Sequence, residues 1–134
     1  MKTQVTYIIL LICLIIFFIN GSCSDYTENL GNGYFYRHEG GPLNDIHCTY
    51  ANGGQIHATV IDYDYDGDFI VAKQKPDLPP DPLSDREYEY KFGVDVIYFW
   101  IIVKKKRLVL GPFNMEEFNV AKDKYKVPND LTLK

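Results

Sequence analysis

The stretch VDVIYFWIIVKKKRLVLGP, residues 94–112, decides the fold, because it holds the single Trp of the chain and its longest apolar run outside the N-terminus. Side chains alternate across a β-strand with period two. The first arm is apolar on both faces, with Tyr98, Trp100 and Ile102 on one and Ile97, Phe99, Ile101 and Val103 on the other. Such a strand needs cover on both sides. We therefore predict a β-hairpin at the centre of a sheet, with its turn at Lys104–Lys106 and its end at Gly111-Pro112.

Shorter strands are predicted on the N-terminal side of this hairpin, over residues 34–38, 45–51, 56–65, 68–74 and 88–92. Asp66-Gly67 is typical of a two-residue hairpin turn, which would place Tyr63 opposite Ile70 and Ile61 opposite Ala72. Residues 75–85 hold four of the seven prolines. We predict a loop of polyproline character there, which an aromatic-lined partner could also recognise.

A helix is predicted after the hairpin. Asn114 is a good N-cap, and Glu117 three residues later completes the spacing of a capping box. Val127-Pro128 ends the helix. The three-and-four spacing of apolar side chains predicts the face that lies on the sheet: Met115, Phe118, Ala121 and Tyr125.

The size of the chain limits it to one domain. Its 134 residues leave room for one modest core behind the N-terminal segment. We predict a mainly β (α+β) fold, in which an antiparallel sheet of about six strands and one C-terminal helix follow an N-terminal hydrophobic signal or anchor helix. Residues 1–22 are the signal peptide or membrane anchor, residues 23–32 a tether, and residues 33–134 the globular domain. The net charge of −4 argues against a nucleic-acid partner.

The N-terminus, MKTQVTYIILLICLIIFFINGSC, has the form of an export signal. Lys2 precedes an unbroken apolar run from Tyr7 to Ile19, and small polar residues follow it. Thirteen apolar residues are fewer than the roughly 20 that a membrane-spanning helix needs. We predict export, with an uncleaved single-pass transmembrane helix as the alternative.

The sequence Gly21-Ser22-Cys23 after this run resembles the lipobox of bacterial lipoproteins, in which the Cys becomes the lipidated first residue. Asn20 stands where that motif prefers Leu, Val or Ile. The resemblance implies lipidation of Cys23, and two acyl chains would anchor the protein stably. The alternative is a disulfide between Cys23 and Cys48.

The strand-and-helix region carries a wider resemblance. The segments DFIVAKQKP and FWIIVKKKRLVLGPFNMEEF resemble a family of small uncharacterised bacterial lipoproteins. That family shares an Ile-Ala-Lys-Gln pattern, a Tyr-Trp-Ile-Ile strand before a basic turn, a Gly-Pro and an acidic helix start. Here the strand reads Phe99-Trp100-Ile101-Ile102 and runs on into Val103. The resemblance covers about residues 25–126 and implies a lipid-anchored envelope protein without an assigned activity.

Three acids at alternate positions are the weak metal candidates. Asp62, Asp64 and Asp66, followed by Gly67, copy the opening of a calcium loop. The twelfth position of that loop should carry a bidentate Glu, and here it is Lys73. The flanking segments are also predicted strands. We therefore interpret the acids as a charged hairpin tip.

The histidines and Cys48 raise two further possibilities, a zinc site and a thiolate nucleophile. His38, His47 and His57 lie on predicted strands or at their ends. Neighbouring strand residues point to opposite faces, so His47 and Cys48 cannot easily bind one metal ion. A lone Cys is more often a small buried hydrophobe than a nucleophile. We predict neither a metal nor a catalytic residue here.

Two charged groups complete the candidates. The acid pair Glu87 and Glu89 could serve glycoside chemistry, but it lies on a solvent-facing pattern. The basic run Lys104–Arg107 could contact anionic lipid headgroups, and we interpret it as a solvated turn.

These observations predict an exported, lipid-anchored protein of the bacterial cell envelope, with its domain outside the cytoplasm and the membrane as its partner through the N-terminus. We expect a non-enzymatic binding or structural module without a cofactor. The alternative is a small envelope hydrolase or an inhibitor of one. A hydrolase needs a concave pocket with a titratable pair inside it, whereas a module needs only an exposed patch.

Overall fold

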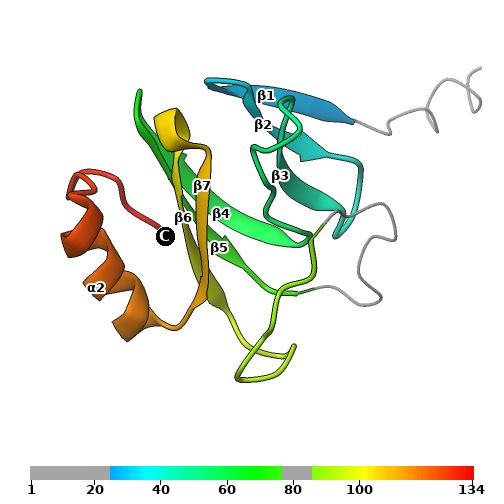
Figure 1. Ribbon diagram of the computed structural model, residues 1–134. Coiled ribbons are helices and arrows are strands. Elements are labelled where there is room, and N and C mark those ends of the chain that lie inside the picture. Colours follow the sequence, from blue (N-terminus) through cyan, green and yellow to red (C-terminus); the bar gives the residue numbers. More distant parts are fainter. Residues whose placement is uncertain (1–24, 77–85) are drawn as a thin grey trace, which may run out of the picture.

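The computed structural model describes residues 25–76 and 86–134. These residues form two antiparallel sheets and a C-terminal helix (Figure 1). The three-stranded sheet, in the order β1-β2-β3, consists of Tyr26–Gly31, Tyr34–His38 and Asn44–Cys48. The four-stranded sheet, in the order β4-β5-β6-β7, consists of Val60–Tyr65, Phe69–Gln74, Tyr98–Val103 and Leu108–Phe113. The 3₁₀ turn η1 spans Lys104–Lys106, and helix α2 spans Met115–Tyr125.

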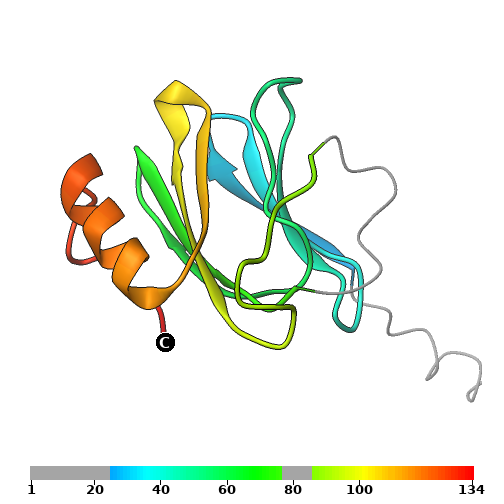
Figure 2. The ribbon, with the colours of Figure 1, turned by 60° about the horizontal axis from the view of Figure 1, so that its bottom comes forward.

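The elements form three layers. Helix α2 covers one face of the four-stranded sheet, and the three-stranded sheet covers the other (Figures 1 and 2). The mainly β class with a C-terminal helix is therefore confirmed. The single sheet of about six strands is wrong, because β1–β3 pack their apolar face against the larger sheet and do not extend it. Between the sheets lie Leu30, Tyr34, Tyr36 and Ile46.

Strand β6 is the centre of the molecule, as its two apolar faces predict. All six of its residues are buried. Trp100 and Ile102 belong to the core between the sheets, and Phe99 and Ile101 belong to the core under α2. The Trp100 indole N–H donates to Gln74 Oε1 at 2.8 Å, so its one polar atom is satisfied in the interior.

Strand β7 continues beyond the predicted end of the hairpin. It runs through Gly111 and Pro112 to Phe113, and the pairing shifts at this point from Ile101–Leu110 to Phe99–Phe113. The bulge explains how a proline fits on the outer strand of the sheet. A Cβ on Gly111 would lie 2.6 Å from Trp100 Cε3, so glycine lets β7 pass close over the indole.

The predicted tether is largely a strand. Residues 26–31 form β1, which pairs with β2 along its length. This strand carries no apolar pattern in the sequence, because YTENLG buries only Leu30. Its pairing comes from backbone hydrogen bonds. Glu28 also joins the two sheets, since it accepts hydrogen bonds from the Tyr63 and Tyr65 hydroxyls of β4.

The β4–β5 hairpin has the predicted strands in a different register. Tyr63 pairs with Ala72 and Tyr65 with Ile70. The Asp66 carboxylate accepts the backbone N–H groups of Asp68 and Phe69 at 2.8 and 2.7 Å. An Asp with these bonds begins a turn and does not occupy its centre. The shift is two residues, so the side chains from Asp62 to Tyr65 stay on their predicted faces. A bulge between Val60 and Asp62 changes the start of β4: Val60 is buried between the sheets, and Ile61, predicted opposite Ala72, is 49% exposed.

The segment before β6 is not the predicted strand 88–92. No strand is assigned in residues 86–97. Tyr88 and Tyr90 pack on the inter-sheet core as their alternation predicts, but Phe92 is 54% exposed. Residues 77–85 of the predicted proline-rich loop lie outside the described residues.

Helix α2 has the predicted cap. The Asn114 side chain accepts the Glu117 N–H at 2.8 Å, and the Glu117 carboxylate accepts the Asn114 N–H at 3.0 Å. Phe118 and Ala121 are buried and Tyr125 packs beside them, whereas Met115 is 51% exposed and does not belong to the predicted face. The chain then folds back under the helix and adds Val127 and Leu131 to the core.

The predicted signal or anchor helix over residues 1–22 lies outside the described residues. Within residues 25–76 and 86–134, no helix has the length and hydropathy needed to cross a membrane.

Candidate functional site

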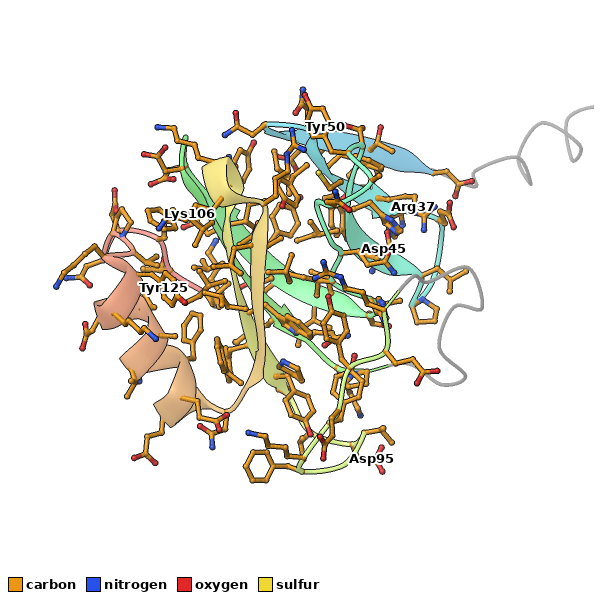
Figure 3. All side chains as sticks on the ribbon, viewed as in Figure 1. Arg37, Asp45, Tyr50, Asp95, Lys106 and Tyr125 are labelled. Atoms are coloured by element: carbon orange, nitrogen blue, oxygen red, sulfur yellow. The ribbon has the colours of Figure 1, made fainter. Side chains whose placement is uncertain are left out.

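The most structured polar site lies on the outer face of the three-stranded sheet. Strands β2 and β3 pair Arg37 with Asp45 and Phe35 with His47. Arg37 Nε and Nη2 donate to the two carboxylate oxygens of Asp45 at 3.0 and 2.7 Å, which is a bidentate pair. His47 Nε2 lies 2.7 Å from Asp45 Oδ2. Figure 3 shows Arg37 and Asp45 side by side on this sheet.

We call this group of side chains the Arg37 cluster; it consists of Arg37, Glu39, Asp45 and His47. Asp45 is its most buried member, at 8% exposure. Burial alone would raise the pKa of the Asp45 carboxyl, but hydrogen bonds from His47 and Arg37 outweigh it and hold that pKa below its ordinary value. Arg37 also pairs with Glu39 at 3.2 Å. The carboxylate is therefore fixed as an anion and serves poorly as a proton donor or acceptor at neutral pH.

An open cavity of about 460 Å³ adjoins the cluster near the start of β1. Its lining combines charged side chains with two exposed apolar ones, and consists of Asp25, Tyr26, Thr27, Arg37, His38, Glu39 and Leu43. The His38 ring packs against the Tyr26 ring in a tilted arrangement, with 5.1 Å between ring centroids, and its Nδ1 bonds the Asn44 side chain. We call this cavity the sheet-edge pocket. The sequence does not indicate this pocket, because it forms where the start of β1 pairs with the end of β2, and residues 26–31 carry no apolar strand pattern.

The three histidines do not converge. His38 and His47 lie on different strands of the outer sheet with the partners named above, and His57 packs against the Tyr88 ring, 5.1 Å between centroids. In the part of the chain that the structure describes, no three His, Cys, Asp or Glu side chains are arranged to hold a metal ion. Cys48 is partly buried against the inter-sheet core with a free thiol, on the face opposite to His47.

The acids of the calcium-like pattern have structural partners. Asp62 accepts the backbone N–H of Lys134, and Asp64 accepts that of Thr132 at 2.9 Å. Asp66 caps the β4–β5 turn through the backbone N–H groups of Asp68 and Phe69. The carboxylates thus hold the C-terminal segment and a turn.

The other site residues that the sequence suggests do not come together in one site either. Glu87 and Glu89 are both exposed and lie in a segment without strand structure. Cys23 lies outside the described residues. The basic turn is not uniformly solvated as predicted: Lys104 is 2% exposed, and its ammonium donates to the Leu30 and Asp66 carbonyls. Burial lowers the pKa of Lys104, and the charges of Asp66 and Asp68 oppose this.

The comparison with protein families gives one match. The family described as "Protein of unknown function (DUF3997)" matches residues 43–134, which is more than half of the chain and includes β3 to the C-terminal segment. No curated protein and no solved structure matches. The family match fits the prediction of an uncharacterised domain, while the lipoprotein motifs stay a prediction.

Proposed function

This chain belongs to the DUF3997 family of proteins of unknown function, and on that premise we propose that it is a lipid-anchored protein of the bacterial cell envelope. Its domain, outside the cytoplasm, binds a partner without catalysing a reaction. The observation that carries the proposal is the order of its N-terminal residues: Lys2, the apolar run Tyr7–Ile19, and Gly21-Ser22-Cys23.

The position of β1 supports a close attachment. Since β1 begins at Tyr26, only Ser24 and Asp25 separate it from Cys23. An extended chain spans at most about 3.6 Å per residue, so this link reaches roughly 10 Å. A lipid on Cys23 would hold the three-stranded sheet, with the sheet-edge pocket, directly at the membrane surface.

The chemistry of the sheet-edge pocket favours binding over catalysis. The guanidinium in its lining, that of Arg37, is held by Glu39 of the lining and by Asp45 of the Arg37 cluster, whose carboxylate is kept ionised. Tyr26 and Leu43 supply exposed apolar contacts beside them. A hydrolase would need a nucleophile or an acid–base pair whose pKa is tuned toward neutrality. The pocket therefore suits a partner that presents a polar group beside an apolar one.

Fatty-acid labelling of cells, followed by fractionation, tests the anchor. The unchanged chain and Cys48→Ala should both carry the label and stay with the membrane, whereas Cys23→Ala should lose the label and move toward the soluble fraction. Cys48→Ala is the matched control, because it removes the thiol inside the domain. An unlabelled wild-type chain that remains in the membrane would instead indicate an uncleaved single-pass helix.

A further inference from the structure

A second cavity, of about 200 Å³, lies at the basic turn, where β1 ends and η1 begins. It is lined by Asn32, Tyr50, Lys104, Lys105 and Arg107. Three of these five side chains are cationic and none is acidic. The cavity therefore concentrates positive charge on a chain whose net charge is −4.

Arg107 is held in position by an aromatic side chain and not by an acid. Its guanidinium lies over the Tyr50 ring, with 4.1 Å from Cζ to the ring centroid. Among the described residues, the guanidinium has no carboxylate partner and no hydrogen bond acceptor. Stacking uses the face of the guanidinium and leaves its N–H edge available. The Arg107 side chain is thus held by the Tyr50 ring and exposed, and the N–H edge of its guanidinium can contact a ligand.

The Tyr50 ring is itself held in place by packing. Its ring lies against Gly33 in the β1–β2 turn, where an added Cβ would be 2.5 Å from Tyr50 Cε2. Gly33 has a φ of +84°, a conformation that glycine adopts without strain. Tyr50 and Lys106 are labelled at the same end of the molecule in Figure 3. The Tyr50 ring on which Arg107 stacks is therefore supported by the backbone of the β1–β2 turn.

The other two cations have different partners. Lys104 is buried, and its ammonium donates hydrogen bonds to two backbone carbonyls. No carboxylate of residues 25–76 or 86–134 forms an ion pair with it. Lys105 pairs with Asp68 at 2.7 Å, but both side chains are largely exposed. Exposed ion pairs of this kind are weak and exchange readily. Asp66, the other nearby acid, already accepts two backbone N–H groups.

We propose that this cavity, the basic-turn pocket, binds a phosphoryl group. Arg107 would provide the bidentate contact for which a guanidinium fits two phosphate oxygens, and Lys105 would exchange Asp68 for the anion. Lys104, whose ammonium is oriented by the Leu30 and Asp66 carbonyls, adds a further cationic side chain to the lining. Either a soluble phosphate ester or the headgroup of an anionic lipid offers this chemistry. The proposal does not depend on lipidation of Cys23.

Arginine side-chain NMR of the full chain in a neutral detergent tests it, because the chain has three arginines and their Nε–H signals are separable by substitution. Inorganic phosphate is the first probe, with acetate as the comparison anion. Phosphatidylglycerol vesicles against phosphatidylcholine vesicles are the second. We expect a saturable shift of the Arg107 signal with phosphate or with phosphatidylglycerol, while the signal of Arg37, which is held by Asp45, stays in place.

Matched variants separate a built pocket from general positive charge. Arg107→Gln should weaken phosphate or phosphatidylglycerol binding at least about tenfold, the effect of losing a charge-assisted contact. Lys106→Gln removes one charge from the same turn at a residue outside the pocket lining, and should leave affinity within about twofold. A response to phosphate alone identifies a soluble source, and one to phosphatidylglycerol alone identifies a headgroup. Equal losses in the two variants, or no response to either probe, would overturn the proposal.

Discussion

The two sheets of this protein bury their residues in opposite ways. In the four-stranded sheet, β6 is covered on one side by α2 and on the other by the three-stranded sheet, and all of its residues are buried. In the three-stranded sheet, β2 buries Tyr34 and Tyr36 on one face and leaves Phe35 and Arg37 on an outer face that is only partly covered. The first sheet supplies stability, and the second supplies a polar surface on which a site can be built.

The largest expected effect compares one aromatic ring from each sheet. Trp100→Ala should lower the free energy of unfolding by about 3 to 5 kcal/mol, the range for deleting a buried large aromatic side chain. Phe35→Ala should lower it by about 0.5 to 1.5 kcal/mol, because its ring is half-buried and stacks on the partly exposed His47 ring. Chemical denaturation measures both. Equal losses would mean that the outer face of β2 is as closely packed as β6, and would contradict the comparison.

From the Arg37 cluster we predict a loss of stability that depends on pH. Asp45→Asn should lower the free energy of unfolding at pH 7 by about 1 to 3 kcal/mol, because a buried, charge-assisted pair is weakened. The folded pKa of Asp45 lies below its unfolded value, so its stabilisation is present above an unfolded pKa of about 3.9 and is lost as pH falls through the folded pKa.

The two proteins should therefore differ at pH 7 and converge as the pH is lowered below about 4. Asp95→Asn is the control, since Asp95 is exposed in the loop before β6 (Figure 3), and it should match wild type throughout. A difference that is constant with pH would mean that the Asp45 charge does not contribute.

A smaller effect is expected at the helix that covers the four-stranded sheet. Asn114→Ala removes the capping side chain and should cost about 1 kcal/mol in unfolding free energy. Asn119→Ala, at an exposed position inside the same helix, should be neutral or slightly stabilising, because Ala has the higher helix propensity. If both variants behaved alike in denaturation, the cap would not be a specific contributor.

The smallest effect concerns calcium and strand β4, at the edge of the four-stranded sheet. Added calcium should leave the melting temperature unchanged, because Asp62 and Asp64 already accept backbone N–H groups of the C-terminal segment. A bound ion would stabilise the native state by mass action. A clear upward shift that disappears in Asp64→Ala would show that a calcium ion binds.

The parts of the fold that could be predicted are those in which one short segment contains the whole sequence pattern. A run that is apolar on both faces predicts a doubly covered strand wherever its neighbours lie, and β6 confirms this. The capping box of α2 is likewise contained in four consecutive residues. Both features depend on local sequence, so no knowledge of tertiary packing was needed.

The parts that could not be predicted depend on which residues of other strands or turns a residue contacts. Strand β1 has one buried side chain, and its partner β2 supplies the reason for its extended form. The division into two sheets follows from the packing of β1–β3 onto the face of β6, which no single segment encodes. The Arg37–Asp45 pair arises only from the register of β2 on β3, just as the stack of Arg107 on Tyr50 arises from two distant turns.

The packing of the first hairpin bears on where this domain can be divided. The family match begins at residue 43, after β1 and β2. Yet Leu30, Tyr34 and Tyr36 are buried between the sheets, and the Tyr34 hydroxyl donates to the Gly53 carbonyl at 2.6 Å. A recombinant fragment cut at the family boundary would lack three of the buried side chains of the inter-sheet core, those of Leu30, Tyr34 and Tyr36. The segment that folds as a unit is therefore longer than the segment that matches the family. A recombinant fragment should begin before Tyr26.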